Sequence, residues 1–133
     1  MNHILVVEDD CSISHLISYN LEQAGYRVVT AFDGAEALHL VDSACPQLVT
    51  LDLLLPRQSG WEVLQAIRTH PRRQIATLPI IVLSALCSPH LRADLRRNGV
   101  EHCLGKPFSV TELCVLVHSL LATRLKVAWE SPL

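Results

Sequence analysis

Short apolar runs alternate along this chain with longer segments whose apolar residues recur at helical spacing. The runs predict strands at residues 4–7, 26–30, 48–52, 80–84 and 101–104. The other segments predict helices over about residues 11–24, 34–45, 61–69, 89–98 and 111–123. Strands that alternate with helices in this way form βαβ units and a parallel sheet. The third and fourth runs are apolar almost throughout, which is typical of central strands covered on both faces. The pattern therefore predicts an α/β fold, a doubly wound five-stranded parallel sheet with helices on both faces.

Composition narrows the class of protein. The 133 residues, of which 50% are hydrophobic and 18% charged, fit one globular domain. A net charge of −2 provides no bulk attraction to nucleic acid or to an acidic membrane surface. The apolar runs are far shorter than the roughly 20 residues of a membrane-spanning helix. We expect a cytoplasmic domain without a signal peptide, because residues 1–3 lead directly into the first strand.

The cysteines and the C-terminal residues lead to two further expectations. The cysteines are odd in number and show no close paired spacing: Cys11, Cys45, Cys87, Cys103 and Cys114. This pattern favours reduced thiols in a cytosolic protein, most of them acting as small core residues. Residues 124–133 have a mixed composition and could extend the last helix, form a tail or begin a linker. We place the domain at residues 1–123 and treat 124–133 as a tail or the start of a linker.

The polar residues that end the apolar runs carry the candidate chemistry. They are Glu8, Asp9 and Asp10 after the first run, Asp52 at the third, Ser84 at the fourth and Lys106 just past the fifth. The carboxyl ends of parallel strands share one edge of an open sheet, where such sheets bind ligands, so we expect these side chains to lie together. Carboxylates suit Mg²⁺ or Mn²⁺, whereas a lysine and a hydroxyl suit phosphoryl oxygens. The sequence therefore predicts a site for a divalent cation and a phosphoryl group.

Each of these residues also has a simpler interpretation. Asp9 or Asp10 could cap the following helix, although adjacent acids repel one another unless a cation lies between them. Asp52 could be a turn residue, but a carboxylate between two leucine-rich stretches is costly to bury. A carboxylate can also act as a nucleophile and form an aspartyl-phosphate. Taken alone, Lys106 is typical of a solvated surface and Ser84 of a helix entry.

Over about residues 3–122 the chain resembles the receiver domains of two-component response regulators. The resemblance rests on Val7-Glu8-Asp9-Asp10, Asp33-Gly34 with Glu36-Ala37-Leu38, Asp52-Leu53-Leu54-Leu55-Pro56 with Gly60, Ser84-Ala85, and Lys106-Pro107-Phe108. It implies a sheet of order 2-1-3-4-5. It also implies a phosphoacceptor switch that catalyses its own phosphorylation and slow dephosphorylation and is not a conventional enzyme. The implied donor is a phosphohistidine on a histidine kinase or a histidine phosphotransfer protein.

The resemblance assigns a role to each residue of the predicted site. Asp52 is the phosphorylated residue, and Lys106 and Ser84 assist it. The implied ligands of Mg²⁺ or Mn²⁺ are Asp10, Asp52 and the backbone carbonyl of Leu54, with Asp9 nearby or acting through water. Leu54 and Leu86 lie two residues beyond Asp52 and Ser84, where they offer no acid or amide to orient an attacking water. This absence predicts slow hydrolysis of the phosphoryl-aspartate.

The implied switch consists of Ser84, Ala85, Cys103 and Pro107. Ser84 is expected to move toward the phosphate, Ala85 to be the small residue beside it, and Lys106–Pro107 to be a cis peptide. Cys103 stands where the family usually has Tyr or Phe, and a thiol cannot fill the space of a ring. We therefore predict a smaller difference between the two states of the switch. Leu55 in place of the common Met is a mild change of shape.

Several other functions compete with this prediction. The main alternative is a pseudo-receiver, a protein-interaction module without phosphorylation, against which the complete set of polar residues argues. The chain lacks the glycine-rich loop of an ATP-using enzyme and the Ser/Thr-rich phosphate loop of a flavodoxin. A phosphatase of the haloacid dehalogenase type typically needs a second Asp where Leu54 stands. Cys87 and His90 form a single C-x-x-H pair, which is weak support for zinc.

The remaining surface yields expectations about partners. The outer face of the last helix carries Cys114, Val115 and His118 and is unusually uncharged. We expect a homodimer or an effector domain to bind through the helix at 89–98, the fifth strand and this last helix. The arginines at positions 72, 73, 92, 96 and 97 form either a solvated surface or a partner surface. We expect no direct contact with nucleic acid and no contact with a membrane.

Overall fold

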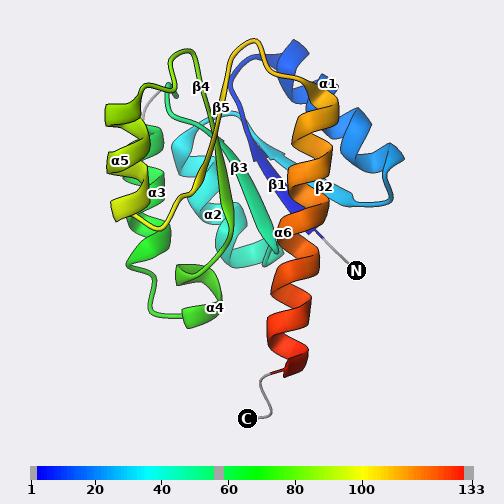
Figure 1. The fold of residues 1–133 in the computed structure, drawn as a ribbon, viewed down its shortest axis with the longest axis vertical. Coiled ribbons are helices and arrows are strands. Elements are labelled where there is room, and N and C mark those ends of the chain that lie inside the picture. The colour runs from blue at the N-terminus through cyan, green and yellow to red at the C-terminus, as the bar shows by residue number, and fades with distance from the viewer. Residues whose placement is uncertain (1–2, 56–58, 131–133) are drawn as a thin grey trace.

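A computed structural model describes residues 3–55 and 59–130, with the side chains of 124–130 excepted. Its five strands form one parallel sheet in the order β2-β1-β3-β4-β5 (Figure 1). The strands are β1 (His3–Val7), β2 (Arg27–Ala31), β3 (Leu48–Asp52), β4 (Ile80–Ser84) and β5 (His102–Gly105). The predicted fold class is therefore confirmed, as is the strand order that the resemblance implied.

The helices lie on both faces of this sheet, as predicted (Figure 1). They are α1 (Cys11–Gln23), α2 (Gly34–Ala44), α3 (Gly60–Arg68), α4 (Arg73–Ala76), α5 (Pro89–Arg97) and α6 (Val110–Glu130). The sequence did not predict α4, because four residues are too few to show a helical period. Among the helices described, none is both long and apolar enough to cross a lipid bilayer.

The last helix extends further than the predicted range of 111–123. It continues to Glu130, which agrees with one of the three interpretations of residues 124–133. Pro56 of the sequence motif and residues 131–133 lie outside the described part of the chain. In Figure 1 the C-terminal part of α6 projects past the end of the sheet.

Two apolar layers hold the helices against the sheet. Successive strand residues point to opposite faces, so Leu5 and Val7 belong to one layer and Ile4 and Val6 to the other. The first layer packs on α2, α3 and α5, and the second packs on α1 and α6. Because both faces are covered, the central strands consist almost entirely of buried residues.

The strand register brings the polar strand ends to one edge of the sheet. Val7 of β1 lies beside Leu51 of β3, so Glu8 and Asp52 follow neighbouring positions. Asp52 lies beside Leu83 of β4, and Ser84 lies beside Gly105 of β5. The backbone N–H of Lys106 donates to the Ser84 carbonyl at 2.8 Å. Four separate segments of the chain therefore meet at this edge.

Candidate functional site

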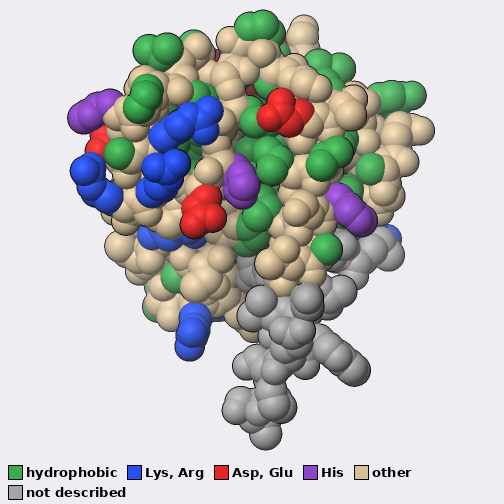
Figure 2. All heavy atoms as spheres, in the orientation of Figure 1, with side chains coloured by type: hydrophobic (Ala, Val, Ile, Leu, Met, Phe, Trp, Pro, Cys, Tyr) green, Lys and Arg blue, Asp and Glu red, His purple; other side chains and the backbone are tan. Residues whose placement is uncertain are grey.

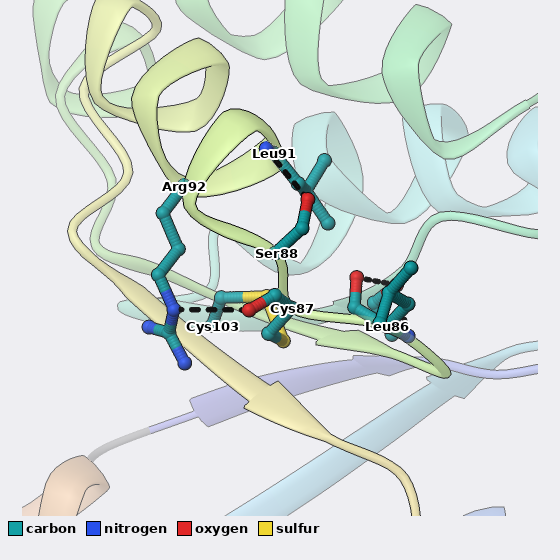
Figure 3. The surroundings of a disulfide bond; sticks show 7 residues. Leu86, Cys87, Ser88, Leu91, Arg92 and Cys103 are labelled. Carbon is teal, nitrogen blue, oxygen red and sulfur yellow. Dashed lines mark hydrogen bonds between the residues drawn. A yellow bond between two sulfur atoms is a disulfide. The ribbon is translucent and has the colours of Figure 1, made fainter.

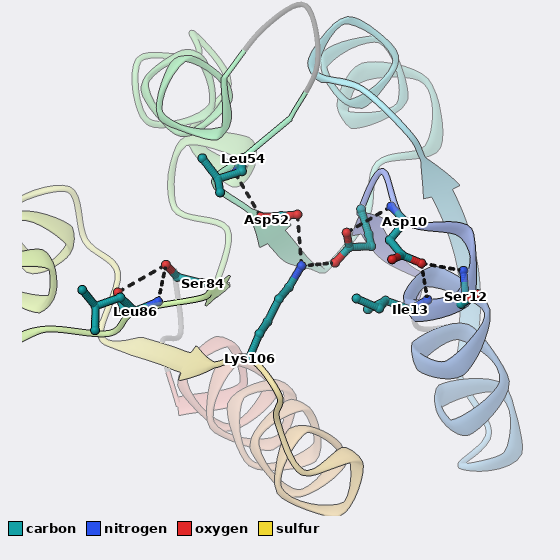
Figure 4. A network of polar contacts seen from close by, with 9 residues as sticks. Asp10, Ser12, Ile13, Asp52, Leu54, Ser84, Leu86 and Lys106 are labelled. Carbon is teal, nitrogen blue, oxygen red and sulfur yellow. Dashed lines mark hydrogen bonds and ion pairs between the residues drawn. The ribbon is translucent and has the colours of Figure 1, made fainter.

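Lys106 lies at the centre of the polar network. Its Nζ is 2.7 Å from Oε1 of Glu8 and 3.1 Å from Oδ2 of Asp52 (Figure 4). Glu8 follows β1, Asp52 ends β3, and Lys106 follows β5, so the ammonium group joins three segments that are distant in sequence. The Glu8 side chain is 1% exposed and that of Lys106 is 21% exposed. Both ion pairs therefore lie largely away from solvent, where electrostatic interactions are strong.

Burial and ion pairing have opposite effects on the pKa of Glu8, and also on the pKa of Lys106. Burial raises the pKa of Glu8, and the hydrogen bond from Lys106 offsets only part of this rise. Burial also acts to lower the pKa of Lys106, but its hydrogen bonds to Glu8 and Asp52 outweigh that effect and raise the pKa. Lys106 is therefore a firmly protonated cation, whereas the Glu8 carboxylate is charged at a cost in free energy.

Three carboxylates form a group that could hold a cation. Glu8, Asp9 and Asp52 each offer an oxygen atom within 4.8 Å of the others. Asp9 is exposed, so a solvated ion can approach the group from its side. Three acids face the single ammonium of Lys106, which leaves an excess of negative charge. Oxygen donors with an open side fit Mg²⁺ or Mn²⁺, since Mg²⁺ retains several of its water ligands.

Asp10 lies outside this group, although the resemblance implied that it is a metal ligand together with Asp52 and the Leu54 carbonyl. Its Oδ1 accepts the backbone N–H groups of Ser12 at 2.9 Å and Ile13 at 3.2 Å, so Asp10 is the N-cap of α1 (Figure 4). The capping role that the sequence also allowed is therefore the one the structure shows. The sequence analysis placed Glu8 at this edge of the sheet but gave it no role of its own. Its position directly after four buried strand residues was the available signal, because an acid there needs a buried partner.

Asp52 is positioned as a buried carboxylate with both oxygens engaged. The residue is 5% exposed, and its Oδ1 accepts the backbone N–H of Leu54 at 3.0 Å. The backbone N–H of Leu54 therefore lies beside the carboxylate, and the role of the Leu54 carbonyl as a metal ligand stays a prediction. The Leu54 side chain is 76% exposed. The site thus opens to solvent past an apolar side chain.

The predicted switch residues lie on the opposite side of Lys106. The Ser84 hydroxyl exchanges hydrogen bonds with the backbone N–H and carbonyl of Leu86, both at 3.3 Å. Figure 4 shows that it faces Leu86 and not Asp52. Ala85 is exposed, and the peptide between Lys106 and Pro107 is cis, as predicted.

Cys103 is bonded to Cys87 in a disulfide, which corrects the prediction of reduced thiols (Figure 3). Free thiols remain at Cys11, Cys45 and Cys114. The two bonded residues are 16 positions apart, so no local motif in the sequence indicated the pair. Spatial neighbours of this kind become visible only when the loop after β4 is placed beside β5.

The comparisons with known proteins agree with this fold. The family model described as "Response regulator receiver domain" matches residues 4–118. The transcriptional regulator RpaA of Synechocystis is 39% identical over 91% of this chain and 49% of its own length. PhoP of Bacillus subtilis, a regulator of alkaline phosphatase synthesis, is 38% identical over 89% of this chain and 48% of its own length. This chain therefore spans about half the length of these two relatives.

Solved structures show the same similarity in three dimensions. The receiver domain of Francisella response regulator 1452 has a TM-score of 0.84 and 31% identity, covering 93% of this chain and 99% of its own. The chemotaxis protein CheY4 of Vibrio cholerae has a TM-score of 0.82 and 32% identity, covering 90% and 98%. The parallel sheet of order 2-1-3-4-5, with polar side chains at the carboxyl ends of its strands, defines the doubly wound α/β class. Within that class, this chain belongs to the receiver domains of two-component response regulators.

Proposed function

We propose that Asp52 accepts a phosphoryl group from a phosphohistidine on a histidine kinase or a histidine phosphotransfer protein. The N–P bond of the donor breaks as an Asp52 oxygen bonds to phosphorus, and the imidazole nitrogen is the leaving group. The observation that carries this proposal is the buried Asp52 carboxylate, whose Oδ2 lies 3.1 Å from the Lys106 ammonium. A carboxylate in this setting is a suitable nucleophile, and the neighbouring cation can stabilise charge on the transferred group.

Lys106 and Ser84 are proposed to bind the phosphoryl oxygens. Lys106 is held between Glu8 and Asp52, so its ammonium is already positioned when the phosphoryl group arrives. The Ser84 hydroxyl would exchange its bonds to Leu86 for one to a phosphoryl oxygen. That exchange would draw the loop after β4 toward the site, and Ala85 leaves room for it.

Mg²⁺ or Mn²⁺ is proposed to bind through Asp9, Asp52 and the Leu54 carbonyl. Glu8 would contribute mainly through its charge, because its Oε1 already accepts a hydrogen bond from Lys106. When bound, the ion neutralises charge on the phosphoryl oxygens as they approach the carboxylates. Asp10 supports this site indirectly, since its backbone N–H donates to Glu8 at 3.2 Å.

Phosphorylation by a small donor tests the proposal directly. Acetyl phosphate with Mg²⁺ should add one phosphoryl group to the protein, seen by intact mass, and hydroxylamine should remove it. Asp52→Asn should abolish the modification, because an amide is not a comparable nucleophile. Asp42→Asn is the matched control, since Asp42 lies on the exposed surface of α2.

Two results would count against phosphorylation at Asp52. A modification that survives in Asp52→Asn would place the phosphoryl group on another residue. If neither acetyl phosphate nor a phosphorylated histidine phosphotransfer domain modifies the wild type, the chain is a pseudo-receiver.

The surroundings of Asp52 support slow hydrolysis once it is phosphorylated. Leu54, which bonds to Asp52, and Leu86, which bonds to Ser84, are 76% and 72% exposed. Neither side chain has a polar atom that could orient a water for attack on phosphorus. We expect Leu54→Asn to change the rate of phosphate loss, measured by the decay of the phosphorylated mass.

The face formed by α5, β5 and α6 is the proposed surface for a second copy or an effector domain. A pocket of about 320 Å³ lies there, lined in part by Arg92, His102 and Leu116. Figure 2 shows basic side chains gathered over α5, where Arg96 and Arg97 are exposed. Val115 of α6 is 63% exposed. Val115→Glu should weaken any self-association that a phosphate mimic induces, as measured by sedimentation.

Because the proposed donor is a histidine kinase, we also propose that the domain acts in the cytoplasm.

A further inference from the structure

The Cys87–Cys103 disulfide connects two segments that both lead to the site. Cys87 belongs to the loop between β4 and α5, and Cys103 is a buried residue of β5 (Figure 3). Cys87 comes three residues after Ser84, and Cys103 comes three residues before Lys106. Ser84 and Lys106 also share a backbone hydrogen bond of 2.8 Å. The covalent link therefore restrains the loop whose movement would carry Ser84 toward a phosphoryl group.

Apart from the disulfide and the packing of Cys87 on the core, the contacts described for this loop are local hydrogen bonds. The Ser84 hydroxyl bonds to Leu86, and the Ser88 hydroxyl accepts the N–H of Leu91 at 3.1 Å. Arg92 Nε donates to the Cys87 carbonyl at 3.3 Å (Figure 3). Each of these bonds spans five residues or fewer, and Leu86 is 72% exposed. The part of the loop between Ser84 and Cys87 has exposed side chains and short-range hydrogen bonds, so we expect it to move more easily once the covalent restraint is removed.

We propose that this disulfide is a redox-controlled lock on the receiver switch. In the oxidised form the loop is tied to β5 with Ser84 turned to Leu86, and phosphorylation shifts the loop little. In the reduced form the loop is free to follow Ser84. The inference rests on the proposed phosphoacceptor function. It adds a second input to that site, a thiol–disulfide signal. Disulfides in cytosolic proteins are usually transient and catalytic or redox-sensing, which is the behaviour proposed here.

The exchange chemistry is a two-electron reaction with a dithiol. A thiolate of the reductant attacks Sγ of Cys87, which is half-buried and therefore more accessible than Cys103. The Cys87–Cys103 bond breaks, and Sγ of Cys103 leaves and takes up a proton. The second thiol of the reductant then displaces Cys87 as a thiol, so the reductant becomes a disulfide. Oxidation by a small disulfide is the reverse reaction.

Mutual coupling between the two inputs provides the test. If reduction favours the loop position that a phosphoryl group selects, the reduced protein must bind a phosphate mimic more tightly than the oxidised protein. We expect the affinity for beryllofluoride with Mg²⁺ to rise roughly fivefold or more on reduction, the lower range of such couplings. Amide exchange of residues 85–91 should respond to beryllofluoride much more strongly in the reduced form.

The experiment compares oxidised wild type, wild type reduced with dithiothreitol, and two variants. Cys87→Ser breaks the bridge at its less buried end and should behave as the reduced protein under both conditions. Cys45→Ser is the matched control, because Cys45 is an exposed free thiol, and it should respond to redox conditions as the wild type does. Intact mass before and after thiol alkylation reports whether the bridge has formed.

The outcomes separate the lock from the phosphoacceptor function. Equal affinity and equal exchange in the two redox forms, or failure of the bridge to form on oxidation, would overturn the lock and leave the phosphoacceptor function intact. If beryllofluoride binds neither form, the phosphoacceptor function fails and the lock fails with it. A redox effect that persists in Cys87→Ser would assign the response to another cysteine and overturn the proposal.

Discussion

Asp9 and Asp10 are neighbours in sequence, but their carboxylates have different surroundings. Asp9 belongs to the acidic group with Glu8 and Asp52, whereas Asp10 caps α1. Asn is about as good an N-cap as Asp, so Asp10→Asn removes a charge and keeps the cap. We expect Asp9→Asn to weaken Mg²⁺ binding roughly tenfold or more. Asp10→Asn should weaken it by less than about threefold, since its solvated charge is screened.

Calorimetric titration with Mg²⁺ checks this difference. Thermal unfolding without the ion serves as the control, because both variants should remain folded. If Asp10→Asn loses as much affinity for Mg²⁺ as Asp9→Asn does, Asp10 is a metal ligand as the resemblance implied.

Glu8 leads to a prediction about pH. Burial raises its folded-state pKa above the ordinary value of 4.5, so in this range the folded state binds more protons than the unfolded state. The contribution of Glu8 to the free energy of unfolding therefore falls as pH rises from 4.5 through the raised pKa. Glu8→Gln keeps an acceptor for Lys106 without the buried charge. We expect it to remove this pH dependence and to be more stable than the wild type at neutral pH without metal.

Urea unfolding over a range of pH, with and without Mg²⁺, measures the effect. Mg²⁺ should stabilise the wild type more than Glu8→Gln, because the ion offsets the negative charge of the acidic group. If Glu8→Gln is less stable than the wild type at every pH, the pairing of Glu8 with Lys106 outweighs the cost of its burial.

At the level of single residues, the sequence correctly predicted the proximity of residues that lie at the ends of strands. Asp52 and Lys106 are adjacent as expected because parallel strands share an edge. Glu8 was placed at the same edge but received no role, because three consecutive acids look alike until the strand and the helix cap on either side are placed. The Cys87–Cys103 bond could not be predicted either, because it depends on how a loop lies against a neighbouring strand.

At the level of secondary structure, one glycine fits α3 against the end of β3. A Cβ atom on Gly60 would lie 2.5 Å from the backbone oxygen of Asp52 and from Cα of Leu53. Because both neighbours are backbone atoms, the helix or the strand end must move. We expect Gly60→Ala to lower the free energy of unfolding by roughly 1–3 kcal/mol and to slow phosphorylation of Asp52.

Gly105→Ala is the matched control for this substitution. A Cβ atom there would meet no atom within 4 Å, so the change in stability should stay within about 0.5 kcal/mol. Urea unfolding and the rate of labelling by acetyl phosphate measure both variants. If the two alanine variants have the same free energy of unfolding, the backbone between β3 and α3 can shift to admit the Cβ atom without loss of stability.

The accuracy of the predicted elements depends on their length and their end signals. The starts of α2 and α5 were predictable because Asp33 and Ser88 are caps, and both side chains accept the expected backbone N–H groups. The short α4 follows Arg72, whose side chain makes no capping bond, so it lacked both a period and a start signal. The end of α6 was placed too early because the mixed composition of residues 124–133 does not distinguish an extension of the helix from a tail.

At the scale of the whole molecule, the extension of α6 beyond residue 123 raises the question of where the folded domain ends. Among the side chains of α6 that the structure describes, which end at residue 123, the buried ones are Leu113, Val117 and Leu121. Figure 1 shows the rest of the helix projecting beyond the sheet. A chain shortened to residues 1–123 should therefore keep its free energy of unfolding within about 0.5 kcal/mol. Leu113→Ala, in the packed part of the same helix, should cost roughly 2–5 kcal/mol.

Urea unfolding of these two proteins beside the full chain measures the difference, and helical circular dichroism shows whether the removed residues were helical. The helical signal should fall in the shortened chain while the unfolding midpoint stays in place, because the backbone of this part of α6 projects past the sheet and does not lie against it. A midpoint lowered as far as in Leu113→Ala would mean that residues 124–133 pack on the domain. The boundary after residue 123 would then be wrong, and the helix extension would be part of the folded unit.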